Sequence, residues 1–538
     1  MQKLLVYICV VLFCAQCAQI TPLTGGKKDD AAPKALSYKP ENVSLNFNTN
    51  VIEVQFDEYI ILKDVANQFI ITPQTKEMPE IEALGKKLKI TFKETLLPNT
   101  TYKLAFGNAI TDLNESNTLQ NFEYIFSTGS IIDSLKLSGQ IFTATDQKPA
   151  GQVLVGLYKA DAGDSIVYKE KPLYISKTDD GGKFSFSYLP DSKFKVIGIR
   201  DQNKNLLYDG SDEQIGFLNQ PVGTNDSSAV LLLLFKEIPA KSFIKKSFQA
   251  EFGKAYVIYN KPQSDIKDVT AEGLVDYAQN TFKDTLTLFY ANKFDTLLTF
   301  VNHTNKIDTV LIKLPSAESY KKRPPVNKYI LQSNIGTMLP FYMLPQFMLN
   351  FPVASLNISG DRMSLVEKLD TVTKQLPFTV LKDTGMITSF QIKADLKPEA
   401  SYTLTLLKDA LTNTTQRTND SATYKFKTTS PEDYAQLNLK VLLPAKENYL
   451  VQLLNDKEQI INQTVVELSL TSTSEKIIAY KNLIPGNYFV KVVEDANKNG
   501  LFDTGDYFLH KLPEAIFVNP MPIKLLAGWE IENEWIVK

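Results

Sequence analysis

The sequence predicts an all-β protein built from tandem β-sandwich modules, some of which are duplicated. Residues 52–56 and 88–92 alternate apolar and polar side chains, as half-buried strands do. Pro, Asn, Asp and Gly cluster between such segments, and short strands with frequent turn signals are typical of sandwiches. Several residues recur 300 positions later, which indicates that one module is built twice.

The amino terminus has the features of an export signal. Lys3 precedes the apolar run 4–13, which is too short to cross a membrane and has the length of a signal-peptide core. Cys17 follows Ala15, as at the cleavage site of a bacterial lipoprotein, so we expect residues 1–17 to be a lipoprotein signal peptide and the Cys17 thiol to carry lipid. Gln16 departs from that pattern, since Gly, Ala or Ser normally precedes the cysteine. An ordinary secreted protein and an uncut signal anchor are the alternatives.

The composition narrows the function classes. The chain has 58 basic and 60 acidic residues, so its net charge of −2 gives no electrostatic attraction to nucleic acid. A hydrophobic content of 43% is enough for several cores. All three cysteines, Cys9, Cys14 and Cys17, lie at the start, so an exported chain would hold its modules by packing or by metal rather than by disulfides.

The first and fourth modules share one pattern. Residues 18–38 are polar and broken by Pro and Gly, which predicts a flexible tether. Residues 39–129 and 337–430 then each contain a proline turn, a strand with Tyr and Leu on one face, and a closing strand with two aromatic residues on one face. The recurring residues are Pro98, Tyr102, Leu104, Tyr124, Phe126 and Thr128, with counterparts Pro398, Tyr402, Leu404, Tyr424, Phe426 and Thr428.

A second related pair follows each copy. In residues 134–236 and 435–538 a proline turn leads into an apolar strand and then into an acidic loop. Residues 240–335 are also strand-like, with no counterpart elsewhere in the chain. The stretch Met363–Leu376 is the best candidate for a helix.

The chain also resembles a known family. The residues that carry the resemblance are Cys17-Ala18-Gln19-Ile20, Pro22, Gly25-Gly26, Lys28-Asp29, Phe56-Asp57-Glu58-Tyr59 and Phe126-Ser127-Thr128-Gly129. This set resembles the start of the Ig-like-domain envelope lipoproteins of the Bacteroidota. The resemblance implies that residues 39–129 are an Ig-like domain similar to those of bacterial surface-layer proteins such as SbsA. It also implies that residues 134–236 are a transthyretin-like or carboxypeptidase-regulatory β-sandwich. By the internal repeat, 337–430 would be a second Ig-like domain and 435–538 a second transthyretin-like sandwich.

Two acidic loops are the best candidate sites. Oxygen-bearing side chains stand at positions 1, 3, 5, 9 and 12 of each loop, which is the ligand spacing of an EF-hand calcium loop. The first loop contains Asp201, Asn203, Asn205, Asp209 and Asp212, and the second contains Asp495, Asn497, Asn499, Asp503 and Asp506. Gly500 occupies the sharp-turn position of the second loop, whereas Leu206 occupies it in the first. The sequence therefore predicts possible Ca²⁺ binding, and an Asx-rich turn that caps its own backbone is the alternative.

The sequence gives little support for catalysis. His303 and His510 are the only histidines, no His-Glu-x-x-His or Gly-x-Ser-x-Gly motif is present, and His303 is expected in a loop. Trp529 and Trp535 are spaced to lie on one face of a strand, where core packing is a more common use than sugar binding.

We therefore expect a non-catalytic, lipid-anchored envelope protein that acts as a structural or binding component. The resemblance implies an outer-membrane lipoprotein, in the periplasmic or the surface leaflet, that could belong to an outer-membrane protein complex. A carbohydrate-binding or adhesive surface protein is one alternative. An enzyme with a carboxylate site between domains is another, because carboxylate pairs in space cannot be recognised in a single sequence.

Overall fold

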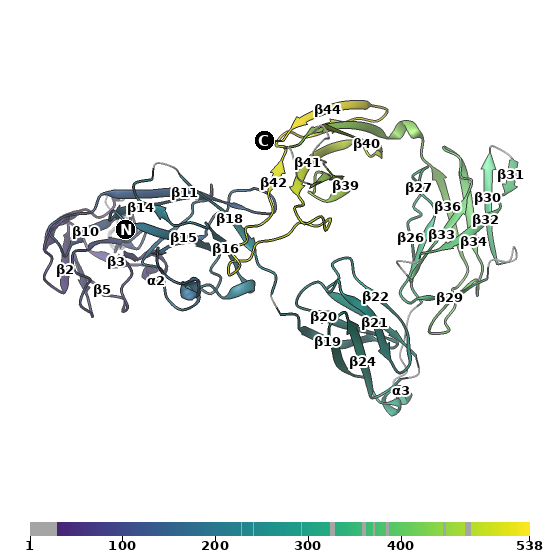
Figure 1. Cartoon of the computed structure of the whole chain (residues 1–538), viewed down its shortest axis with the longest axis horizontal. Helices are drawn as coiled ribbons and strands as arrows, with labels where there is room; N and C mark the ends of the chain where they lie inside the picture. The colour runs from purple at the N-terminus through teal and green to yellow at the C-terminus, as the bar shows by residue number, and fades with distance from the viewer. Residues whose placement is uncertain are drawn as a thin grey trace, which may run out of the picture. The chain divides into compact units, whose positions relative to one another are not determined.

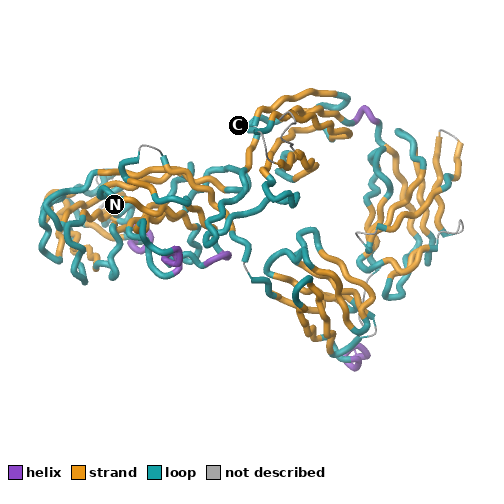
Figure 2. The backbone as a smooth tube through the Cα atoms, in the orientation of Figure 1, coloured by secondary structure: helices purple, strands orange, loops and turns teal. Residues whose placement is uncertain are grey.

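The fold is a succession of β-sandwich modules (Figure 1, Figure 2). The computed structural model describes residues 29–226, 229–239, 241–291, 293–322, 329–357, 362–369, 372–383, 387–444, 448–467 and 475–537. The predicted signal peptide, including Cys17, lies outside these residues. None of the helices in the described ranges has the length and apolar character needed to cross a membrane.

The first module, residues 29–129, packs its sheets around an aromatic core. Its sheets are β1-β2-β6-β5, β10-β7-β4 and β3-β8-β9. The elements are β1 (Ala35–Lys39), β2 (Val51–Phe56), β3 (Ile60–Leu62), α2 (Val65–Gln68), β4 (Ile70–Thr72), β5 (Glu80–Leu84), β6 (Lys87–Thr91), β7 (Thr101–Ala105), β8 (Ile110–Asp112), β9 (Thr118–Leu119) and β10 (Glu123–Ser127). The prediction that 18–38 is a tether is wrong at its end, because β1 pairs with β2 from Ala35 onward.

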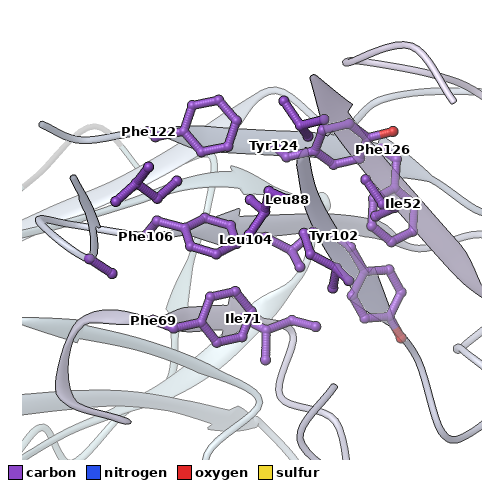
Figure 3. Packing of buried hydrophobic residues seen from close by; sticks show 14 of the residues in the cluster. Ile52, Phe69, Ile71, Leu88, Tyr102, Leu104, Phe106, Phe122, Tyr124 and Phe126 are labelled. Carbon is purple, nitrogen blue, oxygen red and sulfur yellow. The ribbon is translucent and has the colours of Figure 1, made fainter. Parts of the chain in front are cut away.

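The alternating pattern of the first module places its aromatic residues inside. Tyr102, Tyr124 and Phe126 are at most 1% exposed, and Figure 3 shows them beside Leu104 and Phe106. The Tyr102 and Phe126 rings stack with their centroids 5.4 Å apart. Large rings that interlock in this way supply the main apolar burial of a domain without disulfides.

The fourth module, residues 329–430, repeats the first. Its elements are β26 (Leu331–Ser333), β27 (Met338–Leu339), β28 (Gln346–Leu349), β29 (Val353–Leu356), β30 (Met363–Leu369), β31 (Val372–Gln375), β32 (Phe378–Lys382), β33 (Ser389–Ala394), β34 (Ser401–Leu406), β35 (Leu411–Asn413) and β36 (Ala422–Thr428). In the first module Tyr102 pairs with Phe126, and in the fourth Tyr402 pairs with Phe426. The duplication predicted from the sequence is therefore present in the strand register as well.

A tyrosine hydroxyl closes the same corner in both copies. The Leu97 N–H donates to the Tyr102 hydroxyl over 2.9 Å, and the Lys397 N–H donates to the Tyr402 hydroxyl over 2.7 Å. The Thr128 and Thr428 hydroxyls donate to the carbonyl oxygens of the same two residues. Each proline turn is thus fixed to the closing strand by side-chain hydrogen bonds.

The predicted helix at Met363–Leu376 is wrong. Within this stretch Met363–Leu369 form β30 and Val372–Gln375 form β31, and the two strands pair antiparallel from Leu369–Val372 outward (Figure 1). β30 also pairs with β34, so Met363 and Leu365 are buried in the sandwich core while Ser364 and Val366 are more exposed. Tertiary pairing overrides the weak helical pattern, because these side chains alternate between the two faces of a sheet.

The third module is an Ig-like sandwich that the sequence left unassigned. Its elements are β19 (Ile244–Glu251), β20 (Lys254–Tyr259), β21 (Ile266–Ala271), β22 (Leu274–Gln279), β23 (Thr285–Tyr290), β24 (Thr296–His303), β25 (Ile307–Lys313) and α3 (Ala317–Lys322). The sheets are β19-β20-β23-β22 and β21-β24-β25. Lettered A to G in chain order, this is the ABED and CFG arrangement of an Ig constant-type domain.

The second and fifth modules share a topology that differs from the Ig-like one. The second has β11 (Leu135–Thr143), β12 (Leu154–Lys159), η1 (Asp164–Tyr168), β13 (Tyr174–Lys177), β14 (Lys183–Leu189), β15 (Lys193–Ile199), η2 (Gly210–Asp212), β16 (Gln214–Phe217), β17 (Val222–Gly223) and β18 (Val230–Lys236). The fifth has η3 (Pro431–Asp433), β37 (Ala435–Leu442), β38 (Asn448–Leu454), β39 (Ile460–Glu467), β40 (Glu475–Leu483), β41 (Gly486–Glu494), β42 (Ile516–Val518), β43 (Ile523–Leu525) and β44 (Glu530–Ile536).

Strand pairing relates these two modules one to one. The pairs β11·β14, β12·β13, β12·β15 and β15·β17 correspond to β37·β40, β38·β39, β38·β41 and β41·β43. A register shift falls between Leu135 and Leu137 in one module and between Ala435 and Leu437 in the other. They differ in closure, because β16 pairs with β18 whereas the described sheets of the fifth module include no pairing of β42 with β44.

Removing the tyrosine hydroxyl should weaken both Ig-like copies, and the fourth module more, because the Tyr402 hydroxyl also donates to the buried Glu367 carboxylate over 3.1 Å. Tyr102→Phe and Tyr402→Phe each leave a backbone N–H at the corner without its acceptor, which costs about 1–3 kcal/mol. Hydrogen exchange of the full chain, read by mass spectrometry on peptides from each module, measures the loss. Tyr59→Phe is the control, since Tyr59 is 56% exposed. Unchanged exchange in both Tyr variants would contradict the role of the corner.

Candidate functional site

The acidic loop of the fifth module begins at a fully buried carboxylate. Asp495 follows β41 directly and is 0% exposed. Its Oδ1 accepts the Asn499 N–H over 3.0 Å and its Oδ2 accepts the Gly500 N–H over 2.9 Å. Gly500 has a φ of 74°, so the chain curls tightly around the Asp495 side chain. The loop therefore turns about its first predicted ligand.

Three further predicted ligands gather beside Asp495. The Asn497 and Asn499 side-chain amides both donate to the Asp503 carboxylate, the second over 3.1 Å. The Asn497 and Asn499 side-chain oxygens accept backbone N–H groups of the same loop, from Asn499 over 3.1 Å and from Leu501 over 2.7 Å. The Lys511 ammonium lies 3.5 Å from Asp503. In this state the loop satisfies its own polar groups, which is the arrangement of an Asx-rich turn.

Glu514 also contacts this loop. It lies outside the predicted ligand spacing, so the sequence pattern did not identify it. Its two carboxylate oxygens accept the N–H groups of Ala496, over 3.1 Å, and of Asp503, over 2.8 Å. Burial raises the pKa of Glu514, and repulsion from Asp503 and Asp495 raises it further, while the two N–H bonds oppose the rise. The loop thus concentrates negative charge on three carboxylates.

Asp506, the predicted ligand at position 12, lies in a separate turn. Its side chain accepts the Leu509 N–H over 2.9 Å, and its backbone forms a bridge with Lys511. The structure therefore brings together Asp495, Asn497, Asn499 and Asp503, adds Glu514, and places Asp506 in the next turn.

The loop of the second module has the same local construction. Asp201 accepts the Leu206 N–H over 2.8 Å, as Asp495 accepts that of Gly500. The side-chain oxygens of Asn203 and Asn205 accept the N–H groups of Asn205 and Leu207. Leu206 has a φ of 64°, so it adopts the left-handed conformation of Gly500 despite carrying a side chain. Leu206 in place of glycine therefore adds backbone strain, but the loop follows the same path.

A buried glutamate again completes the second-module loop. Glu213 is 3% exposed and accepts the Asp209 N–H over 3.1 Å, in the role that Glu514 has toward Asp503. Asp212 lies in the short helix η2 rather than beside Asp201. Each loop thus pairs its ninth position with a glutamate outside the predicted spacing.

The side chains of both loops accept hydrogen bonds from backbone N–H groups of the same loop. Their carboxylate and amide oxygens are also the ligands that Ca²⁺ prefers. Over the described parts of the chain, no group of three or more His, Cys, Asp or Glu side chains stands close enough together to hold a metal ion. All four gathered ligands donate or accept hydrogen bonds within the loop itself. Coordination would require the asparagine and aspartate oxygens to leave those bonds and turn inward.

Part of the chain matches a known family. Residues 29–128 match the family model of the bacterial Ig-like domain. This range covers the first module, and it begins before the predicted boundary at residue 39, in agreement with β1.

Solved structures show similarity at very low sequence identity. The S-layer protein rSbsC is 10% identical, over 92% of this chain and 68% of that chain, with a TM-score of 0.14. BcpA, the major pilin subunit of Bacillus cereus, is 10% identical, over 75% of this chain and 99% of that chain, also with a TM-score of 0.14. Scores this low carry no argument about shared arrangement or function. No curated protein matches the chain.

The structure also places the tryptophans and a histidine. Trp535 lies in β44 and packs against the core of the fifth module, as expected, whereas Trp529 precedes β44 and is 48% exposed. His303 is the last residue of β24 rather than a loop residue, and it is 5% exposed.

Gly500→Ala should destabilise the fifth module by about 1 kcal/mol, because a side chain at positive φ is strained even where space is open. Nothing lies within 4 Å of the position that its Cβ would take, so the effect isolates backbone conformation. Gly163→Ala is the matched control, since that site is equally open and its φ is −66°. Exchange rates of peptides that span each substituted glycine measure the change in its own module, and equal effects of the two variants would contradict the prediction.

Proposed function

We propose that this protein is a non-catalytic, lipid-anchored component of the bacterial cell envelope that acts structurally or by binding other proteins. The observation that carries the proposal is the position of Cys17, four residues after the end of an export-type apolar run and before a stretch, 18–538, with no other cysteine. Tandem sandwiches without disulfides fit a scaffold role, because the first, third, fourth and fifth modules each have their own packed core. The resemblance in the sequence supports an envelope lipoprotein, and we propose the outer membrane as its site and an outer-membrane protein complex as its partner.

The anchor is tested on Cys17 itself. Wild-type protein should incorporate a fatty-acid analogue and sediment with membranes, while Cys17→Ala should remain unlabelled and either leave the membrane fraction or stay unprocessed. Wild-type protein that is unlabelled and fully soluble would refute the anchor. Pull-down from detergent-solubilised membranes then tests the partner, and recovery of the chain alone would contradict a role in a complex.

We also propose that the loop Asp495–Asp506 binds Ca²⁺ and that the loop Asp201–Asp212 is a second candidate. Support comes from the recurrence of one backbone path and one ligand pattern in both loops. Asp495, Asp503 and Glu514 are mutually repulsive, so a divalent cation among them would replace a costly interaction with a favourable one. In that state the asparagine and aspartate oxygens would face the ion.

Calcium should slow hydrogen exchange in the fifth module, and Asp495→Ala should abolish the effect. At a hundredfold excess over Kd the ion would stabilise the folded state by about 2.7 kcal/mol. The pKa of Glu514 is raised in the folded protein, so the folded state is stabilised while this carboxyl is protonated. That stabilisation is lost as pH rises through the titration of the carboxyl. The calcium effect should therefore grow from acid to neutral pH.

Peptides of the third module, which contains neither loop, are the internal control. Equal exchange with calcium and with chelator at neutral pH would leave only the Asx-rich turn. An effect that survives Asp495→Ala would place the ion elsewhere in the chain.

A further inference from the structure

His303 is enclosed between two carboxylates in the third module. It ends β24, and its side chain is 0% exposed. Its Nδ1 lies 2.9 Å from the Asp265 carboxylate, which precedes β21, and its Nε2 lies 2.9 Å from the Asp308 carboxylate in β25. Both ring nitrogens therefore face an oxygen that, when ionised, only accepts hydrogen bonds.

This geometry specifies the proton content of the ring. A neutral imidazole has one N–H and one lone pair, so it can satisfy only one of the two carboxylates. The imidazolium ion has two N–H groups and satisfies both. The Lys306 ammonium lies 3.0 Å from Asp308, so two carboxylates, one imidazolium and one ammonium form a cluster without net charge.

The remaining neighbour gives the ring no alternative partner. The Tyr259 ring in β20 meets His303 edge to face, with centroids 6.1 Å apart. The Tyr259 hydroxyl is buried near the Asp308 carboxylate. Burial raises the pKa of Tyr259, and the charge of Asp308, its hydrogen bonding and the charge of Asp265 add to the rise, so the phenol stays neutral. The titratable groups that face His303 are thus Asp265, Asp308, Lys306 and Tyr259.

The cluster joins two loops at one end of the sandwich. The Thr304 N–H donates to the Asp265 carbonyl over 3.1 Å, and the His303 N–H donates to the Lys306 carbonyl over 2.8 Å. The segment from β20 to β21 and the turn from β24 to β25 therefore meet at the histidine. In Ig-type domains these two loops lie at the same end and commonly carry binding functions.

We propose that His303 is held as an imidazolium ion and acts as a pH-dependent clamp on the loop end of the third module. Loss of one ring proton would place a nitrogen lone pair of the buried ring against a carboxylate and replace an attraction with a repulsion. The two loops would then separate more readily, so the loop end is most ordered while His303 is charged and loosens as the ring deprotonates.

The carboxylates set the acid limit of the clamp. The hydrogen bond from His303 lowers the pKa of Asp265, so its contribution to stability is present above the pKa of the unfolded chain and is lost as pH falls through the lowered value. The clamp therefore requires ionised carboxylates on the acid side and a protonated ring on the alkaline side.

Nitrogen NMR of the full chain with ¹⁵N-labelled histidine tests the charge state directly. The sequence has only two histidines, so His510→Gln leaves His303 as the single signal source without touching the cluster. We expect both ring nitrogens of His303 to report bound protons at neutral pH, because each faces a carboxylate. A spectrum with one protonated and one unprotonated nitrogen at neutral pH would overturn the proposal, and this measurement needs no variant at the cluster.

Hydrogen exchange tests the clamp itself. In Asp265→Asn the ring faces one carboxylate instead of two, so peptides covering 259–266 and 300–308 should exchange measurably faster at neutral pH than in the wild-type chain. Asp268→Asn is the matched control, since Asp268 is an exposed residue of the adjoining strand β21. Equal exchange in the two variants would overturn the clamp even if the ring proves to be charged.

Discussion

The packing of the inner sheet faces is the constraint on which every module depends, because the chain after Cys17 contains no cysteine to join one sheet to another. In the first module Ile52, Val54 and Phe56 of β2 are completely buried and the residues between them are not. The Tyr102 hydroxyl then uses the polar end of a buried ring to hold the adjoining turn. Apolar burial supplies the stability, and a few hydrogen bonds to buried hydroxyls select one geometry.

The loops at the ends of the modules curl tightly, and their backbone N–H groups need hydrogen-bond acceptors. Asp201 and Asp495 each place a carboxylate in the centre of a loop and accept backbone N–H groups around it. Asp112 does the same for the N–H groups of Glu115, Ser116 and Asn117 in the first module. Short acidic side chains therefore serve local structure throughout, and a cation would act on loops that are already formed.

Charged groups at the end of the third module also satisfy one another, around the buried His303. A buried ion is tolerated only when opposite charges and hydrogen bonds surround it, and Asp265, Asp308 and Lys306 meet that condition at one end of the third module. Strand pairing brings these residues together, since β24 pairs with both β21 and β25. The acidic loops and the histidine cluster both lie where strands end, so the polar chemistry of this chain is concentrated at the ends of its sandwiches.

The sequence by itself determined the all-β class, the duplicated modules and the composition of the two acidic loops. Side-chain alternation and residues such as Tyr102 and Tyr402 are local signals, and a repeat preserves them in register. Only the tertiary structure decided that Met363–Leu376 is a hairpin, that the third module is Ig-like, and that Glu514 joins Asp495 while Asp506 does not. It also decided the surroundings of His303. These features depend on which strands pair, and pairing joins residues whose separation along the chain carries no periodic signal.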